Sequence, residues 1–140
     1  MMSGVPVQPI VDEATKRSSV LWLDVAGAAQ PQPMWHLWQD GVAYVVTGGL
    51  EQPWPGDALA TTAVVLVRSR ERQGDLLVRW EAAVAHVEPG TPLWDEVVPV
   101  LHAKKMNRVD GEQQPDRWAR ECTVRSLTPT GLLLDVAATG

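Results

Sequence analysis

The sequence predicts a mainly β protein, a small antiparallel β-barrel of six or seven strands with helices packed at its periphery. Three observations support this fold class. Short segments rich in β-branched and aromatic residues recur along the chain. Turn signals made of Gly, Pro and Asp separate these segments. One main segment, late in the chain, has the apolar spacing of an amphipathic helix.

The first quarter of the chain predicts an arm, a short helix and a strand. Residues 1–12 mix Gly, Pro and Val without a period, so we expect a loose N-terminal arm to a single domain that spans residues 1–140. Residues 12–19 are expected to form a short helix with Asp12 as its N-cap. Residues 20–25 form an apolar run of strand length, and a turn follows at residues 27–33.

A hairpin at residues 34–47 is the strongest local pattern. Asp40-Gly41 lies between two strand-like runs, Met34–Gln39 and Val42–Thr47, and this dipeptide is typical of a tight hairpin turn. Both faces of these strands are largely apolar. We therefore expect the hairpin to be covered on both sides, by helices or by a second subunit.

The middle of the chain predicts a loop and two longer strands. Pro53 and Pro55 exclude regular structure from the loop at residues 50–60. Residues 61–68 are strand-like, residues 69–75 form a charged turn, and residues 76–88 alternate as a half-exposed strand.

The last third predicts a helix and two closing strands. Thr91 is a suitable N-cap for the helix, which Pro99 should kink or interrupt. Residues 115–120 are expected to add a helical turn. Two strands at residues 121–127 and 132–136, split by Pro129 and Gly131, are expected to close the barrel.

Composition narrows the class of function. The net charge of −5 and the scattered Lys and Arg favour neither nucleic acid nor a membrane surface as partner. No stretch approaches the roughly 18 to 20 apolar residues of a membrane span, and the first residues lack the pattern of a secretory signal. The single cysteine fits a reducing compartment, so we expect a cytoplasmic protein, and the amino-acid bias suits a GC-rich bacterial genome. Seven tryptophans exceed what a small barrel interior holds, which favours a homodimer.

The order of elements resembles that of the pyridoxamine 5'-phosphate oxidase-like family of FMN-binding split β-barrels. Three segments carry the likeness: Ser19–Val25, Pro33–Gly49, and the ending Thr123–Pro129. At the level of element order, the resemblance covers most of the chain. It implies a homodimer with a small-molecule ligand at the dimer interface.

In that family a flavin, or in some actinobacterial branches a deazaflavin, lies along the strand that matches Met34–Trp38. Polar groups near the end of the strand matching Tyr44–Thr47 help to hold the cofactor. The resemblance therefore implies that the cofactor-binding residues of this chain are Trp35, His36, Thr47, Gly48 and Gly49.

This chain departs from the family pattern where the phosphate is held. Many members carry a basic residue where this chain has Pro31-Gln32-Pro33, and another in the segment matching residues 50–56, which has none here. Ser126 also stands where a basic residue is common. A phosphate dianion needs charged donors or clustered backbone N–H groups. The pair Gly48-Gly49 can supply the latter, and Lys104 or Lys105 can contribute if the late helix reaches the site.

Two functions stay open. The first is a flavin- or deazaflavin-dependent oxidoreductase of unknown substrate, in which the cofactor performs hydride transfer and no side chain is an obvious acid or base. The alternative is a non-catalytic ligand-binding or structural homodimer that has lost the phosphate clamp. FMN, a deazaflavin, heme or no cofactor are the possibilities that the sequence leaves.

Other residues with chemical potential have simpler interpretations. His36, His86 and His102 are too far apart in sequence to indicate a metal site. Trp54, on a loop bounded by prolines, either lids a pocket or covers the end of the barrel. Cys122 has no identifiable histidine partner and is interpreted as a small buried hydrophobe.

Overall fold

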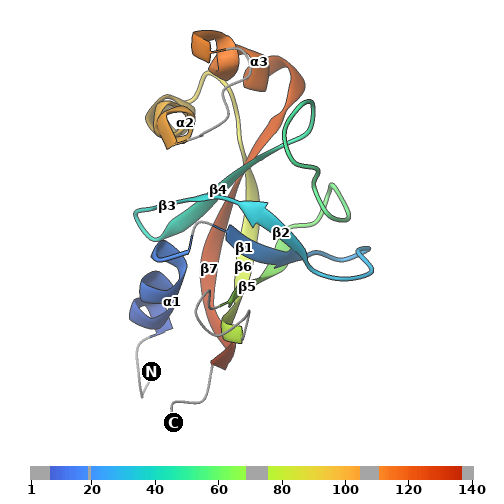
Figure 1. The fold of residues 1–140 in the computed structure, drawn as a ribbon, viewed down its shortest axis with the longest axis vertical. Coiled ribbons are helices and arrows are strands. Elements are labelled where there is room, and N and C mark those ends of the chain that lie inside the picture. Colours follow the sequence, from blue (N-terminus) through green and yellow to red (C-terminus); the bar gives the residue numbers. More distant parts are fainter. Residues whose placement is uncertain (1–6, 19, 69–75, 105–110, 137–140) are drawn as a thin grey trace.

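The computed structural model describes residues 7–18, 20–68, 76–104 and 111–136, and within them the chain forms seven strands and three α-helices (Figure 1). The prediction of a mainly β fold is confirmed. In chain order the elements are α1 (Val7–Lys16), β1 (Val20–Asp24), β2 (Gln32–Trp35), β3 (Leu37–Gln39), β4 (Val42–Thr47), β5 (Thr62–Arg68), β6 (Leu76–Val87), α2 (Pro92–Lys104), the 3-10 helix η1 (Gly111–Gln113), α3 (Gln114–Glu121) and β7 (Thr123–Val136).

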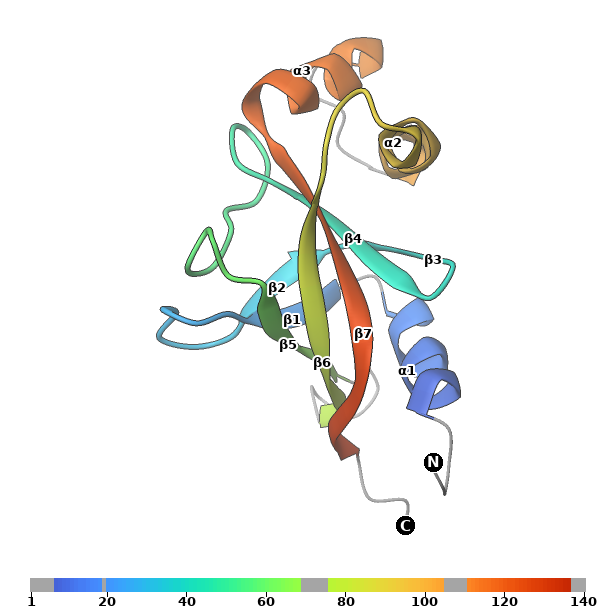
Figure 2. The same cartoon turned by 180° about the vertical axis from the view of Figure 1, so that it is seen from behind.

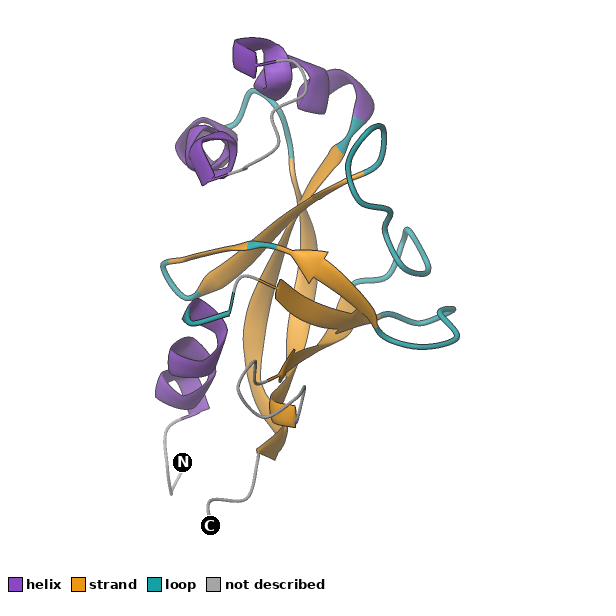
Figure 3. Ribbon diagram, in the orientation of Figure 1, coloured by secondary structure: helices purple, strands orange, loops and turns teal. Residues whose placement is uncertain are grey.

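The strands form one antiparallel sheet that curls into a nearly closed barrel. Its strand order is β2-β1-β5-β6-β7-β4-β3, so β2 and β3 are the two edges of the sheet. These two edges follow each other in the chain with only His36 between them. The sheet must therefore bend until its edges meet, and the barrel has a seam at His36. Strands β6 and β7 extend along most of the molecule (Figure 3).

Two apolar cores lie on the two sides of the sheet. The first fills the barrel, with Trp80 and Leu21 fully buried, and α1 adds Val11 to it. The second lies where α2 and α3 pack on the outside of the barrel, and it contains Trp118 and Leu101. Helices α2 and α3 lie at one end of the long strands, and α1 lies beside the other end (Figure 2). The apolar pattern on both faces of the hairpin thus has a structural explanation within one chain.

The N-terminal helix begins earlier than the sequence predicts. Helix α1 starts at Val7, so residues 7–12, expected as part of a loose arm, are helical. Asp12 lies inside the helix instead of capping it, and its carboxylate accepts a hydrogen bond from Trp38 Nε1 at 2.6 Å. The apolar positions Ile10, Val11 and Ala14 pack on the barrel core, and this tertiary contact outweighs the weak local signal.

The continuity of the strands was predicted wrongly at two places. The expected strand at residues 34–39 is broken at His36, because its two halves pair with different neighbours, β1 and β4. The two expected closing strands are one strand, β7, which continues through Pro129 and Gly131. The pairing of β6 with β7 is irregular there, and Gly131 has a φ of 98°, so a bulge accommodates the proline.

Several local predictions are confirmed. Asp40 and Gly41 both have positive φ, as a tight hairpin turn requires. The Thr91 hydroxyl accepts a hydrogen bond from Trp94 N at 3.2 Å, as an N-cap does. By contrast, the expectation that Pro99 interrupts helix α2 was wrong, because the helix continues through Pro99 to Lys104. The expected turn at residues 69–75 lies outside the described residues. None of the described helices is long and apolar enough to span a bilayer.

Candidate cofactor site at the barrel seam

The side chain of Gln52 joins the two halves of the predicted site. Its Oε1 accepts a hydrogen bond from Trp35 N at 2.9 Å, and its Nε2 donates to Trp35 O at 2.8 Å. The backbone carbonyl of Gln52 accepts the Gly48 N–H at 2.9 Å. Because β2 is an edge strand, its outer backbone groups lack a strand partner, and the Gln52 amide fills that role. The end of β2 and the end of β4 therefore meet at the seam.

The five predicted site residues differ in their access to solvent. Gly48 and Gly49 are exposed and Trp35 is half-buried, whereas His36 and Thr47 are buried, with 0% and 2% of their surface exposed. The glycine pair and Trp35 are therefore the members of this set that solvent reaches. The roles of all five residues in binding stay a prediction.

The glycine pair packs closely on the junction between α3 and β7. Both residues have positive φ, 90° for Gly48 and 55° for Gly49. A Cβ on Gly49 would lie 3.2 Å from Cys122 Sγ and 3.3 Å from Glu121 O, and the Cys122 thiol donates to Gly48 O at 3.3 Å. The segment that approaches the glycine pair closely is thus the α3–β7 junction of the same chain. Cys122 was expected to be a small buried hydrophobe, but it is half-buried and hydrogen-bonded.

Replacing Gly49 tests this packing. We expect Gly49→Ala to lower the free energy of unfolding by more than Gly111→Ala. Both glycines have a φ of 55°, where an alanine costs about 1–2 kcal/mol, but Gly111 has open space around its Cβ position. The difference between the two variants in urea denaturation isolates the contact with Cys122 and Glu121. Equal losses of unfolding free energy in the two variants would contradict close packing around Gly49.

A buried ion pair fixes the loop at residues 48–61 to helix α3. Arg117 Nη2 donates to Glu51 Oε2 at 2.8 Å, and Trp118 Nε1 donates to the same oxygen at 3.0 Å. Both charged side chains are only 5% exposed. The Arg117 guanidinium is therefore engaged in holding the fold. Sequence reasoning missed this pair because it joins residues 66 positions apart in the chain.

Helix α2 reaches the seam through Lys104. Its Nζ donates to His36 O at 2.9 Å. The late helix therefore does reach one of the predicted site residues, which was the condition for Lys104 to contribute. Partial burial lowers the pKa of Lys104 from its ordinary value. Its neighbour Lys105 lies outside the described residues. A cation therefore stands next to the hairpin break, bound to a backbone carbonyl.

A second cation, Arg125, lies near the predicted site and was missed from the sequence. Its Nη1 donates to Thr47 Oγ1 at 2.9 Å, and its guanidinium carbon lies 4.0 Å from the ring centroid of Trp54. Arg125 pairs with Val45, which faces the barrel interior, so Arg125 points inward, whereas Ser126 points to the other face. Ser126 stands at the position that is basic in many family members. In this chain the basic residue comes one position earlier, so its side chain points to the other face of the sheet and lies beneath Trp54.

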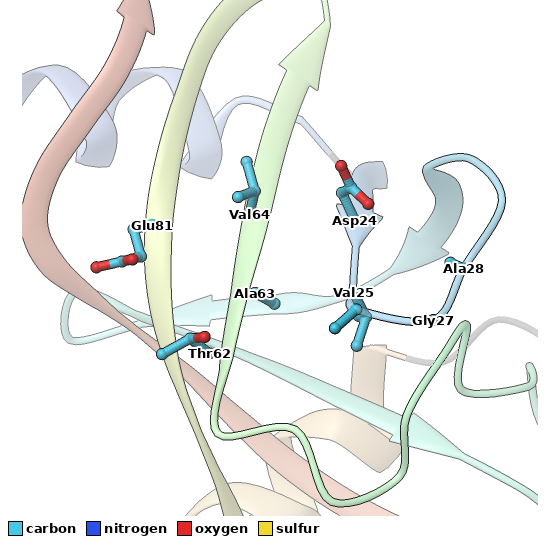
Figure 4. Close-up of a pocket in the computed structure, with 9 residues that line it drawn as sticks. Asp24, Val25, Gly27, Ala28, Thr62, Ala63, Val64 and Glu81 are labelled. Atoms are coloured by element: carbon cyan, nitrogen blue, oxygen red, sulfur yellow. The ribbon is translucent and has the colours of Figure 1, made fainter.

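A shallow pocket of about 310 Å³ lies apart from the seam (Figure 4). The end of β1, the start of β5 and the middle of β6 contribute to it, and its lining includes Asp24 and Glu81 from the strands on either side of β5. None of the five predicted cofactor residues lines it. Among the described residues, no three His, Cys, Asp or Glu side chains gather as a metal site would require.

Three solved structures share this fold. The heme storage protein HutZ from Vibrio cholerae matches with a TM-score of 0.65 at 12% identity, over 94% of this chain and 96% of its own. A candidate pyridoxamine 5'-phosphate oxidase from Listeria innocua matches with a TM-score of 0.60 at 11% identity, over 91% and 98%. A candidate 5-nitroimidazole antibiotic resistance protein from Bacteroides thetaiotaomicron matches with a TM-score of 0.58 at 7% identity, over 90% and 81%.

No protein-family model matches the sequence, and no curated protein sequence matches it significantly. The structural matches establish that the chain has the split-barrel fold of pyridoxamine 5'-phosphate oxidase-like proteins. At identities of 7 to 12% they establish the fold alone.

Donors near the glycine pair that a phosphate group would need are already bonded within the chain. A phosphate dianion needs free donors, but the Gly48 N–H is already used by Gln52 and Arg117 is paired with Glu51. The polar groups nearest to the glycine pair are thus largely engaged within the chain.

Proposed function

We propose that this chain is a flavin- or deazaflavin-dependent oxidoreductase that holds the cofactor ring at the barrel seam. The observation that supports the proposal is the Gln52 bridge, which joins the backbone of Trp35 to that of Gly48. Trp35, His36, Thr47, Gly48 and Gly49 are the proposed site, with Trp35 and the glycines in direct contact. A bound flavin would supply hydride transfer, and the chain would position the ring.

The fold of the similar structures supports this proposal without identifying the ligand. One of them is described as a heme storage protein and another as a candidate pyridoxamine 5'-phosphate oxidase. A flat heteroaromatic ligand is common to both chemistries. We infer that the ligand of this chain is likewise flat, with FMN, a deazaflavin and heme as the species to test.

A specific observation favours a second candidate, a non-catalytic ligand-binding or structural homodimer. The polar groups around the seam are engaged with one another: Gln52 with Trp35, Glu51 with Arg117, and Lys104 with the His36 carbonyl. Such a seam holds the fold together even when no cofactor is present. This candidate predicts no detectable affinity for FMN or a deazaflavin.

Titration with FMN separates the two candidates. Each charged hydrogen bond missing from the phosphate contributes roughly 1.5–3 kcal/mol. Losing two or three of them weakens binding by about two to six orders of magnitude. We therefore expect purified protein to retain little yellow colour and to bind FMN weakly in an absorption titration.

Each possible result of the ligand titrations leads to a different conclusion. Weak saturable binding that Gly49→Val abolishes supports the cofactor site, provided that circular dichroism shows a folded variant. Stoichiometric binding at submicromolar concentration would show that the phosphate is better held than the structure indicates. No affinity for FMN, a deazaflavin or heme would overturn the oxidoreductase proposal and leave the second candidate.

We further propose that the functional unit is a two-fold homodimer that uses the hairpin and its neighbours. The loop beside the glycine pair exposes two large apolar side chains, Leu50 at 64% and Leu59 at 85% of their surface. A second copy would remove both from water. We expect sedimentation velocity to give a dimer and Leu59→Asp to shift it toward monomer. A stable wild-type monomer at micromolar concentration would contradict the dimer.

A further inference from the structure

Arg125 is a buried cation whose charge no carboxylate neutralises within the described part of the chain. Only 4% of its surface is exposed. Its polar contacts are all to neutral groups, namely the Thr47 hydroxyl at 2.9 Å and the Ala58 carbonyl at 3.5 Å, and its Nε is buried without a hydrogen-bond partner. Burial lowers its pKa from the ordinary value, yet a guanidinium stays charged at neutral pH.

A buried guanidinium in such surroundings is unusual because desolvation of a charge is costly unless an opposite charge compensates it. The Trp54 ring over the guanidinium gives partial compensation through a cation–π contact. The bidentate edge formed by Nε and Nη2 has only the long contact to Ala58 O. That edge matches the two oxygens of a phosphate or carboxylate group.

We propose that Arg125 and Thr47 form an anion site at the end of the barrel, closed by Trp54, which takes the phosphate group of a ligand. The site would replace the clamp that the sequence lacks around Pro31 and at residues 50–56. This inference rests on the proposed function because Thr47 precedes the glycine pair on which the ring would rest. Binding requires the segment that carries Trp54 and Ala58 to move away from the guanidinium.

Trp54 is placed as the cover of this site. Its Nε1 donates to Asp57 O at 2.9 Å within its own loop, and the ring packs against the barrel core, so this side-chain hydrogen bond would move with the loop. The anchors at Glu51 and Gln52 lie before it in the chain and would stay in place when it moves. The cover costs affinity, because opening it breaks the cation–π contact.

Thermal unfolding in the presence of inorganic phosphate tests the site. The probe is sodium phosphate, with sodium chloride adjusted to hold the ionic strength constant. We expect phosphate to raise the Tm of the wild-type protein and Arg125→Met to remove this increase. Loss of one charged hydrogen bond corresponds to roughly 10- to 100-fold weaker binding. An unchanged phosphate response in Arg125→Met would overturn the proposal.

Arg68→Met is the matched control. Arg68 also lies over a tryptophan, with its guanidinium carbon 5.3 Å from the Trp22 ring centroid, but on β5. We expect Arg68→Met to keep the wild-type increase of Tm with phosphate. If Arg68→Met also lost this increase, the assignment of the site to Arg125 would be overturned. If Arg125→Met fails to fold, Trp54→Ala decides. Without the cover, phosphate should bind more tightly than to wild type, and no gain would overturn the proposal.

Comparison of FMN with riboflavin separates this inference from the proposed function. Riboflavin has the same ring without the phosphate. If FMN binds more tightly than riboflavin to the wild type, and the two flavins bind equally to Arg125→Met, the result supports both the anion site and the cofactor proposal. Equal affinities in the wild type overturn the anion site and leave the ring site standing. A phosphate response that depends on Arg125, with no binding of either flavin, supports the anion site and overturns the cofactor proposal.

Discussion

Glu51→Gln is expected to lower the free energy of unfolding by roughly 3–5 kcal/mol, because it removes one partner of a buried ion pair. The carboxylate of Glu51 accepts hydrogen bonds from both Arg117 and Trp118, and both charged side chains are 5% exposed. A glutamine keeps the size of the side chain but leaves the guanidinium without the negative charge beside it. Urea denaturation followed by circular dichroism measures the loss.

Glu13→Gln provides the matched control for this substitution. Glu13, on α1, pairs with Lys16 and with Arg17 just beyond the helix, but its side chain is 52% exposed. Exposed ion pairs contribute about 0–1 kcal/mol, so this variant should be nearly as stable as wild type. Equal losses in the two variants would show that the Glu51 pair is not the anchor of the loop on α3.

Trp80→Ala is expected to destabilise the barrel by about 3–5 kcal/mol, because it leaves a cavity in the middle of the first core. Trp80 is fully buried on β6 and contacts the Trp38 ring edge-on, with centroids 6.0 Å apart. Its Nε1 has no hydrogen-bond partner among the described residues.

Trp80→Phe separates packing from polarity at the same position. It keeps an aromatic ring and removes a donor that makes no hydrogen bond, so we expect a clearly smaller loss than for alanine. Both variants are compared by urea denaturation. A phenylalanine variant as unstable as the alanine variant would show that the indole N–H has a partner, such as a buried water.

Local sequence patterns were sufficient to predict the fold class and the position of most strands. Asp40-Gly41 defined the hairpin because its backbone requirement is met by few dipeptides. The strands β5 and β6 were predicted from β-branched content and alternation, properties that depend on neighbours in the chain. These signals are local, so they are readable in one sequence.

The contacts that organise the candidate site are not local. Gln52 bonds to Trp35 across 17 residues, and Arg125 reaches Thr47 across 78. The break at His36 depends on β2 and β3 joining opposite edges of one sheet. No periodicity or spacing in the sequence encodes such pairings. Arg125, which lies in one of the predicted closing strands, was not singled out from the sequence.

The cofactor site itself is tested most directly by nuclear magnetic resonance of the ¹⁵N-labelled protein during titration with FMN. We predict that the shifted signals are those of the Gly48 and Gly49 amides and the Trp35 indole and amide. Signals from the distant pocket, such as Gly27 and Ala63, should stay unchanged. Shifts confined to that pocket, or no shifts at all, would contradict a ring-binding site at the seam.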